Sequence, residues 1–183
     1  CVGGGAASAT RRGLSVATRY AVQRTQFRLP GLGDEIALLD YLSHQRKLLP
    51  NTARAYAYGY AMNEFSLQLQ RVLDAEGSDP VHARELETRA AGLKAVLTRW
   101  ANDTVQVCRE ACGGAGYMSE NQLTLIRQDV DVFATFEGDN TVLLQLVAKA
   151  LLTDYRQVWG DLDRVGMVQQ AAKLVGGTVL ERT

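Results

Sequence analysis

The stretch Thr135-Phe136-Glu137-Gly138-Asp139-Asn140-Thr141-Val142-Leu143-Leu144 joins a polar turn to an apolar segment. Its polar half places a carboxylate beside a glycine and ahead of residue types that commonly cap helix N-termini. The apolar half continues to Leu152 and predicts a helix that begins directly after the turn. Glu137 therefore lies on an elbow, from which a carboxylate can project into a cleft while its backbone stays anchored.

Two interpretations of Glu137 follow from this position. A carboxylate near a helix N-terminus commonly stabilises the positive end of the helix dipole, and on local sequence alone that role is the commoner one. The alternative is a catalytic base, because a carboxylate in an apolar cleft binds a proton more readily than it does in water.

Residues 80–112, which precede the elbow, give the clearest helical pattern in the chain. Cys108 and Cys112 lie one turn apart in it, and no further cysteine or histidine stands nearby, so we expect buried thiols and no metal site. The run Gly113-Gly114-Ala115-Gly116 then predicts the end of the helix. Apolar or small residues recur in steps of three and four, which is typical of a bundle helix: Leu86, Ala90, Leu93, Leu97, Trp100, Thr104, Val107 and Ala111.

Three more helices are expected, at about residues 5–26, at 34–73 with a kink or a division at Pro50, and from the elbow to about residue 155 or 159. His44 is expected at the surface or hydrogen-bonded, the tyrosines at 56, 58 and 60 in the core or lining a ligand tunnel, and Arg127 paired with Asp129. The stripe expected to face the core from residues 34–73 is Leu42, Leu49, Ala53, Tyr56, Tyr60 and Leu67.

These elements predict an all-α fold, a four-helix up-down bundle with an extra C-terminal helix. We expect residues 1–183 to form a single helical domain, with a bundle core at about 5–155 and a C-terminal extension at about 160–180. The chain begins at Cys1 and not at methionine, so a domain cut from a longer protein is expected.

The charge balance, the apolar runs and the cysteine count indicate which kinds of partner and compartment to expect. Twenty basic and twenty acidic residues balance to a formal net charge of zero, which gives no electrostatic basis for binding nucleic acid or an anionic membrane surface. No apolar run reaches the roughly 20 residues that a membrane-spanning helix needs. Three cysteines fit a reducing compartment better than a disulfide framework. With no targeting signal recognised, and with Glu181-Arg182-Thr183 unlike a peroxisomal tripeptide, a bacterial cytoplasmic protein is predicted.

Three motifs occur together between residues 108 and 144: Cys-Arg-Glu-Ala-Cys-Gly-Gly-Ala-Gly-Tyr at 108–117, Arg-Gln-Asp at 127–129, and the Phe-Glu-Gly elbow. This combination resembles the C-terminal helical domain of the acyl-CoA oxidases and, more distantly, that of the acyl-CoA dehydrogenases. The resemblance extends from the first helix to about Leu152. It implies a domain of an FAD-dependent oxidoreductase that converts a fatty acyl-CoA into a trans-2-enoyl-CoA in fatty acid β-oxidation.

The resemblance also implies roles for individual residues, with Glu137 as the base that removes the α-proton. Substrate contacts are implied at Tyr117 and Gly138. Taken alone, Arg24 is a helix-dipole partner, the double glycine a helix stop and Asp139 a cap. Flavin contacts are implied at Arg24, Gln26, Phe27, Glu110, Gly113, Gly114, Asp139 and Thr141. Several of these contacts would cross a subunit interface of a homodimer or homotetramer. Gln26 and Glu110 differ from the residues that the dehydrogenases commonly have at these two positions.

The elbow wording Phe-Glu-Gly-Asp-Asn-Thr favours an oxidase, which passes electrons to dioxygen and forms hydrogen peroxide. One alternative is a dehydrogenase that reduces an electron-transfer flavoprotein, and another is a helical oligomerisation module without catalysis. Most flavin and thioester contacts in the family come from other domains, so we expect this chain alone to be inactive.

Overall fold

The computed structural model describes residues 2–28, 31, 33–74 and 80–160, and the chain divides into two compact units, residues 1–144 and 145–183. Each unit is described by itself. The helices are α1 (Val2–Gln23), α2 (Leu42–Asp74), α3 (Pro80–Ala111), α4 (Leu123–Asp131) and α5 (Asn140–Trp159). Two short strands, β1 (Thr25–Arg28) and β2 (Glu35–Ala37), pair antiparallel with Thr25 opposite Ala37 and Arg28 opposite Glu35.

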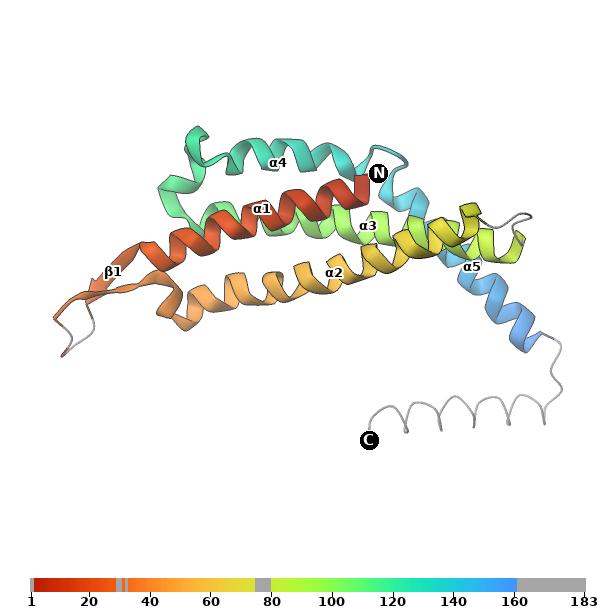
Figure 1. Ribbon diagram of the computed structural model, residues 1–183, viewed down its shortest axis with the longest axis horizontal. Coiled ribbons are helices and arrows are strands. Elements are labelled where there is room, and N and C mark those ends of the chain that lie inside the picture. The colour runs from red at the N-terminus through yellow and green to blue at the C-terminus, as the bar shows by residue number, and fades with distance from the viewer. Residues whose placement is uncertain (1, 29–30, 32, 75–79, 161–183) are drawn as a thin grey trace. The chain divides into compact units, whose positions relative to one another are not determined.

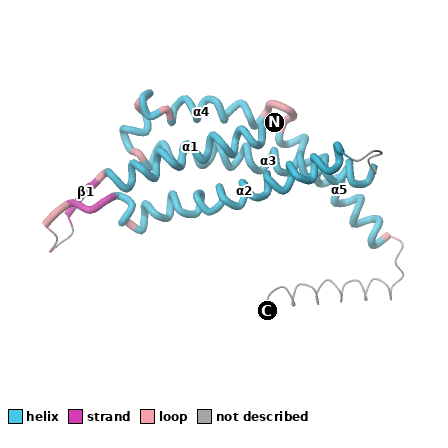
Figure 2. The backbone as a smooth tube through the Cα atoms, in the orientation of Figure 1, coloured by secondary structure: helices cyan, strands magenta, loops and turns pink. Residues whose placement is uncertain are grey.

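Helices α1 to α4 form an up-down bundle in which successive helices run in opposite directions (Figures 1 and 2). α1 packs against α2, α3 and α4, and α3 also packs against α2 and α4. The predicted all-α fold is confirmed. The helix predicted from the elbow onward is α5, which starts in the first unit at Asn140 and ends at Trp159. The predicted extension at 160–180 lies outside the described residues, apart from Gly160.

The core surrounds α3 on two sides. One cluster contains Leu14, Leu48, Leu97, Trp100 and Leu123, and it lies among α1, α2 and α3 with α4 at its edge. A second, smaller cluster lies among α1, α3 and α4: Ala6, Ala101, Val105, Ile126 and Val130. The face of α1 toward α3 carries mainly small residues, which allow the two helix backbones to approach closely.

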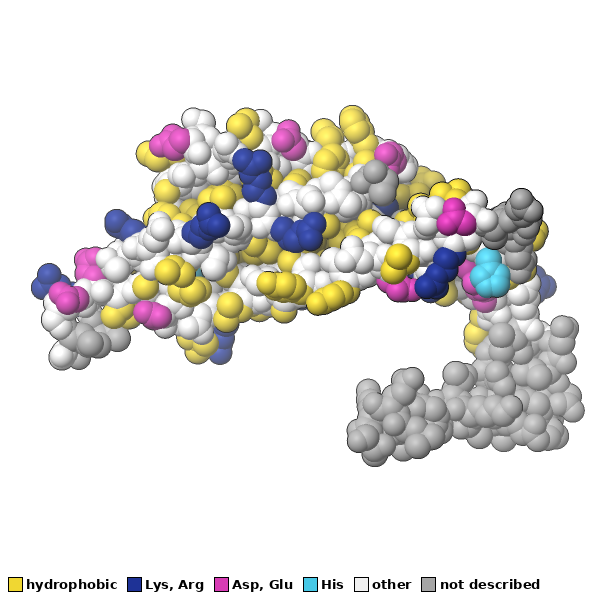
Figure 3. All heavy atoms as spheres, viewed as in Figure 1, with side chains coloured by type: hydrophobic (Ala, Val, Ile, Leu, Met, Phe, Trp, Pro, Cys, Tyr) yellow, Lys and Arg dark blue, Asp and Glu magenta, His cyan; other side chains and the backbone are white. Residues whose placement is uncertain are grey.

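The predicted start and orientation of α2 are wrong. Residues 35–37 pair with β1, and α2 begins only at Leu42, after a short 3₁₀ turn at Leu38–Asp40. On α2 the buried residues are His44, Leu48 and Ala55, so His44 is not at the surface. The predicted stripe is exposed instead, and Figure 3 shows hydrophobic side chains at the surface along α2. Several faces of α2 fit a spacing of three and four, and the face that carries Leu48 and Ala55 is the one that is buried.

The predicted burial of the two thiols is confirmed, since Cys108 and Cys112 are free and buried. Among the described residues, no group of three or more histidine, cysteine or acidic side chains is arranged to hold a metal. Pro50 lies inside α2, which continues through it as one helix to Asp74, so the helix is not divided there. None of the helices described here has the length and apolar character required to cross a bilayer.

Candidate functional site

The elbow joins α4 to α5. After a 3₁₀ turn at Val132–Ala134, the backbone turns at Glu137, with a φ of 55°, and Gly138, with a φ of 105°. Both angles lie in the left-handed region, which glycine adopts freely but which costs a glutamate about 1 kcal/mol. A Cβ at Gly138 would also lie 3.2 Å from Leu143 Cδ2. The turn leaves the Glu137 side chain exposed at the surface of this unit.

A buried lysine on α3 holds the elbow. The side chain of Lys94 is only 8% exposed, and its Nζ donates to Ala134 O at 3.2 Å, Gly138 O at 2.5 Å and Asn140 Oδ1 at 2.9 Å. Three acceptors satisfy the three protons of the ammonium. Burial lowers the pKa of Lys94, and the nearby carboxylates of Asp139 and Glu137 act in the opposite direction.

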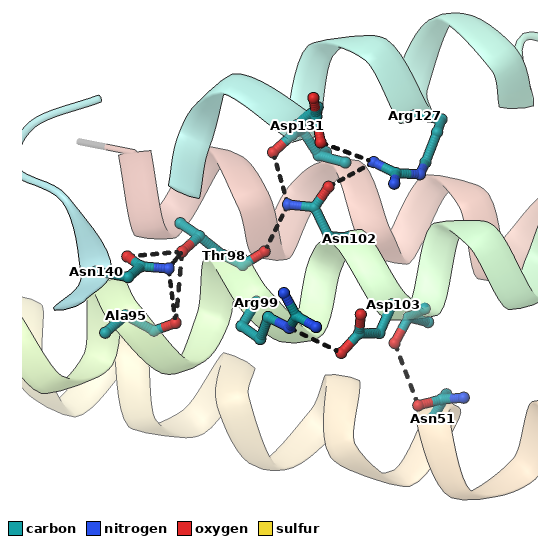
Figure 4. Close-up of polar contacts among 11 residues, drawn as sticks. Asn51, Ala95, Thr98, Arg99, Asn102, Asp103, Arg127, Asp131 and Asn140 are labelled. Atoms are coloured by element: carbon teal, nitrogen blue, oxygen red, sulfur yellow. Dashed lines mark hydrogen bonds and ion pairs between the residues drawn. The ribbon is translucent and has the colours of Figure 1, made fainter. Parts of the chain in front are cut away.

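The first residue of α5 is fixed to α3 by a second set of bonds. Asn140 Nδ2 donates to Thr98 Oγ1 at 2.9 Å and to Ala95 O at 3.4 Å, as Figure 4 shows. The Asn140 Oδ1 atom lies 3.2 Å from the Thr98 hydroxyl, which can donate to it. Because Lys94 and Thr98 are one turn apart on α3, one face of that helix carries both anchors of the elbow.

The same face continues for one more turn to Asn102, which fixes α4. Asn102 Nδ2 donates to Val130 O at 3.0 Å, and Asn102 Oδ1 accepts from Arg127 Nη1 at 2.5 Å. Arg127 also pairs with Asp131 at 3.2 Å (Figure 4), so the predicted pair with Asp129 is wrong. On a helix, residues four apart share a face and residues two apart do not, which explains the partner.

The Glu137 carboxylate contacts the first described residue of α1 and not the start of α5. Glu137 Oε2 accepts a hydrogen bond of 3.1 Å from the backbone N–H of Val2. The cap of α5 is Asp139, whose Oδ1 accepts from the Thr141 N–H at 2.8 Å. Hydrogen bonds from the Thr141 backbone and hydroxyl hold the pKa of Asp139 below its ordinary value. The capping role considered for Glu137 on α5 therefore belongs to Asp139.

The residues predicted to contact flavin from the end of the first helix lie in the hairpin. α1 ends at Gln23, so Arg24 follows the helix and Gln26 and Phe27 belong to β1. Gln26 O accepts a hydrogen bond of 2.6 Å from Tyr41 Oη, and Phe27 is exposed with a φ of 64°. The hairpin pairing, which joins Thr25 to Ala37 and Arg28 to Glu35, ends α1 before the predicted Gln26.

The glycine turn after α3 has an accessible backbone. Gly113 has a φ of 55°, and a Cβ at either Gly113 or Gly114 would meet nothing within 4 Å. Glu110 is exposed, and its Oε1 accepts from Gln106 Nε2 at 2.5 Å. These positions can admit another group close to the main chain.

Tyr117 at the end of this turn has a partner that sequence reasoning missed. The guanidinium of Arg109 lies 4.6 Å from the centroid of the Tyr117 ring, a cation–π contact on an otherwise exposed tyrosine. Tyr117 therefore has a fixed neighbour on α3, but the turn Gly113–Tyr117 lies at the opposite end of the bundle from the segment that joins α4 to α5 (Figure 1).

The predicted site residues form two groups, one at each end of α1. Glu137, Gly138, Asp139 and Thr141 lie near its N-terminus, whereas the hairpin and glycine-turn residues lie near its C-terminus (Figure 1). A helix of 22 residues is about 33 Å long, so a single copy of this chain does not gather both groups around one small molecule.

The tyrosines of α2 have different surroundings, with Tyr58 packed against the bundle and Tyr56 and Tyr60 exposed. Tyr58 packs edge-on against Trp100, with ring centroids 4.9 Å apart, as expected for a core residue. Tyr56 and Tyr60 line a cavity of about 570 Å³ between α1 and α2, together with Arg11 and Arg19.

The sequence analysis also missed Lys94, Thr98 and Asn102, which hold the elbow and α4. Their signal is a row of polar residues at steps of four, on a helix whose neighbouring positions are apolar. Buried polar side chains are nearly always hydrogen-bonded, so such a row on a buried helix face indicates that another element supplies their partners.

Comparison with known proteins places this geometry in context. A family profile described as "Acyl-CoA oxidase, C-alpha1 domain" matches residues 2–152. The chain is 44% identical over 144 residues to acyl-coenzyme A oxidase 3, peroxisomal, of Arabidopsis thaliana, which covers 78% of this chain and 20% of that protein. It is 34% identical over 177 residues to peroxisomal acyl-coenzyme A oxidase 1 of Mus musculus, covering 96% of this chain and 25% of that protein.

Among solved structures, acyl-CoA oxidase-1 of Caenorhabditis elegans, complexed with FAD and ATP, matches with a TM-score of 0.78 and 29% identity. The match covers 88% of this chain and 26% of that one. The chain thus spans about a fifth to a quarter of the length of these relatives.

The predicted bacterial cytoplasmic location is wrong, because the matching plant and mammalian proteins are named as peroxisomal. That prediction rested on missing targeting signals. In a chain that spans only a part of its relatives, a missing signal carries no information about the compartment.

Proposed function

Because the chain belongs to the family of acyl-CoA oxidase C-alpha1 domains, we propose that it forms the C-terminal helical domain of an FAD-dependent acyl-CoA oxidase. The observation that carries the proposal is the family match over residues 2–152, which includes the whole bundle and the elbow. The proposed reaction removes the α-proton and a β-hydride from a fatty acyl-CoA and leaves a trans-2-enoyl-CoA.

Glu137 is the proposed base for the α-proton. Its Oε2 is bound to the Val2 N–H, while none of the described hydrogen bonds involves Oε1, which is the atom that would receive the proton. The side chains of Phe136 and Val142, on either side of the elbow in sequence, are exposed and provide apolar surface on this segment. An acyl chain that covers this surface would exclude water from the carboxylate, as general-base catalysis at a carbon acid requires.

The residues present fit a flavin dinucleotide in their chemistry. Arg24 offers a fork-shaped cation suited to pyrophosphate, and the accessible backbone at Gly113 and Gly114 offers close approach. When bound, FAD supplies the hydride acceptor for the β-carbon and the electrons for dioxygen. Glu110 is the least favourable member of the set, since a carboxylate repels pyrophosphate.

The separation of the two residue groups supports a homo-oligomer. In the proposal, one copy places the hairpin and glycine turn against a flavin while the elbow of another copy supplies Glu137 and Thr141. This arrangement accounts for site residues at both ends of a helix about 33 Å long.

The test uses the full-length protein loaded with FAD and supplied with a fatty acyl-CoA in air. Dioxygen consumed, hydrogen peroxide formed and enoyl-CoA formed are measured together, and a ratio near one for all three is expected. Enoyl-CoA formed only with an added artificial acceptor would identify a dehydrogenase. No turnover under either condition, from a protein that still assembles, would favour the oligomerisation module.

A further inference from the structure

We propose that Lys94 is a positioning residue for the Glu137 carboxylate, acting by binding the main-chain carbonyls on both sides of it. The inference rests on the proposed function, in which Glu137 is the base. Lys94 itself does not touch the reacting atoms. Its role is to fix the direction in which the Glu137 side chain leaves the elbow.

The geometry is a clamp across the elbow. Lys94 Nζ donates to Ala134 O, three residues before Glu137, and to Gly138 O, one residue after it. Its third bond goes to Asn140 Oδ1, at the start of α5. The ammonium therefore joins the end of the turn after α4 to the start of α5, and Glu137 lies in the loop that it closes.

The elbow needs such a clamp because its backbone conformation is unfavourable by itself. Glu137 and Gly138 have φ angles of 55° and 105°, and residues 135–139 are all exposed, so burial does not hold them. A non-glycine residue persists in the left-handed region only when its surroundings restrain it. The bonds from Lys94 to the two flanking carbonyls supply that restraint from a rigid helix.

The chemistry of the side chain suits this task. An ammonium has three donors and no acceptor, and here it meets three acceptors that point toward one position. Lys94 is buried, and its backbone packs against α1, since its Cα lies 3.6 Å from the place that a Cβ on Gly3 would take. A methionine at 94 would keep the stem but lose every hydrogen bond.

The experiment compares full-length Lys94→Met with wild type, with rates expressed per bound flavin. We expect kcat to fall by about 10- to 100-fold with KM for acyl-CoA within about twofold, since a misplaced base weakens catalysis more than substrate binding. We also expect a larger deuterium isotope effect on kcat with α-deuterated acyl-CoA, because proton removal becomes more strongly rate-limiting. Lys47→Met, which removes an exposed lysine from α2, is the matched control and is expected to behave as wild type.

A role in folding alone predicts a different result. It would reduce the fraction of enzyme that carries flavin and leave kcat per flavin and the isotope effect unchanged, and that outcome overturns the inference. If Lys94→Met does not bind flavin, Lys94→Gln, which keeps two amide donors, replaces it. If Lys94→Gln carries no flavin either, or if it binds flavin and has a wild-type isotope effect, Lys94 is structural and the inference is wrong.

Glu137→Gln is measured in parallel to separate the two proposals. An active Glu137→Gln enzyme would refute the assignment of the base itself. An inactive Glu137→Gln enzyme together with a wild-type Lys94→Met enzyme would refute only the positioning role.

Discussion

The main chain passes so close to itself after α3 that a Cβ on Gly116 would lie 1.9 Å from the carbonyl oxygen of Arg109. Only glycine fits there. This close approach brings Tyr117 back against the Arg109 guanidinium and shapes the turn that carries Gly113 and Gly114.

The first prediction follows from that approach. Gly116→Ala should lower the free energy of unfolding by about 3 kcal/mol, because the backbone of α3 cannot yield as a flexible side chain would. Gly114→Ala is the control, since a Cβ there meets nothing within 4 Å, and it should change stability by less than about 0.5 kcal/mol. Thermal unfolding of the flavin-free protein measures both, and equal effects would contradict the packing described for Gly116.

A second prediction tests the face that α2 turns to the bundle. Leu48 is fully buried and Leu49, its neighbour in sequence, is 51% exposed. Leu48→Ala should therefore cost about 2–5 kcal/mol, through lost burial and a cavity, and Leu49→Ala less than 1 kcal/mol. Denaturant unfolding of the domain measures the pair. A larger loss of stability for Leu49→Ala than for Leu48→Ala would mean that the stripe predicted from the sequence, which contains Leu49, faces the core.

A third prediction concerns the thiols of Cys108 in α3 and Cys112 directly after it. Burial raises the pKa of Cys108 to about 12 and that of Cys112 to about 11. A raised thiol pKa lowers the thiolate fraction, so at pH 8 alkylation of the folded protein should be slower than for an exposed cysteine by two orders of magnitude or more.

Labelling followed by peptide mass spectrometry gives the rate at each cysteine separately. Reaction should increase as the pH rises toward 11, with Cys112 ahead of Cys108, and both should react at once in denaturant. Rapid labelling of either thiol in the folded protein at pH 8 would contradict their burial.

The features that the sequence predicted correctly depend on local signals. α3 begins at Pro80 and ends just before Gly113, and α5 begins directly after the elbow, because proline, glycine and capping residues act within one turn of the helix ends. The position of Glu137 on an elbow was also predicted from local signals. The left-handed backbone conformation of Glu137 was not predicted, because non-glycine residues give no local sign of that conformation.

The features that the sequence missed depend on contacts between distant segments. β2 replaces the expected start of α2 because it pairs with β1, and the face of α2 was ambiguous because more than one stripe of apolar residues fits a helical period. Lys94 meets acceptors 40 to 46 residues further along the chain, so only the folded structure identifies them. The polar row on α3 indicated that partners existed without indicating which.

One comparison decides whether Glu137 is the base of an acyl-CoA oxidase. Full-length wild type, Glu137→Gln and the exposed-carboxylate control Glu120→Gln are incubated with a fatty acyl-CoA in air, and the rate of enoyl-CoA formation and the hydrogen peroxide formed per enoyl-CoA are measured. We expect a ratio near one for wild type and Glu120→Gln, and a rate at least about 1,000-fold lower for Glu137→Gln, which keeps the shape but cannot accept the proton. Full activity in Glu137→Gln would show that another group is the base.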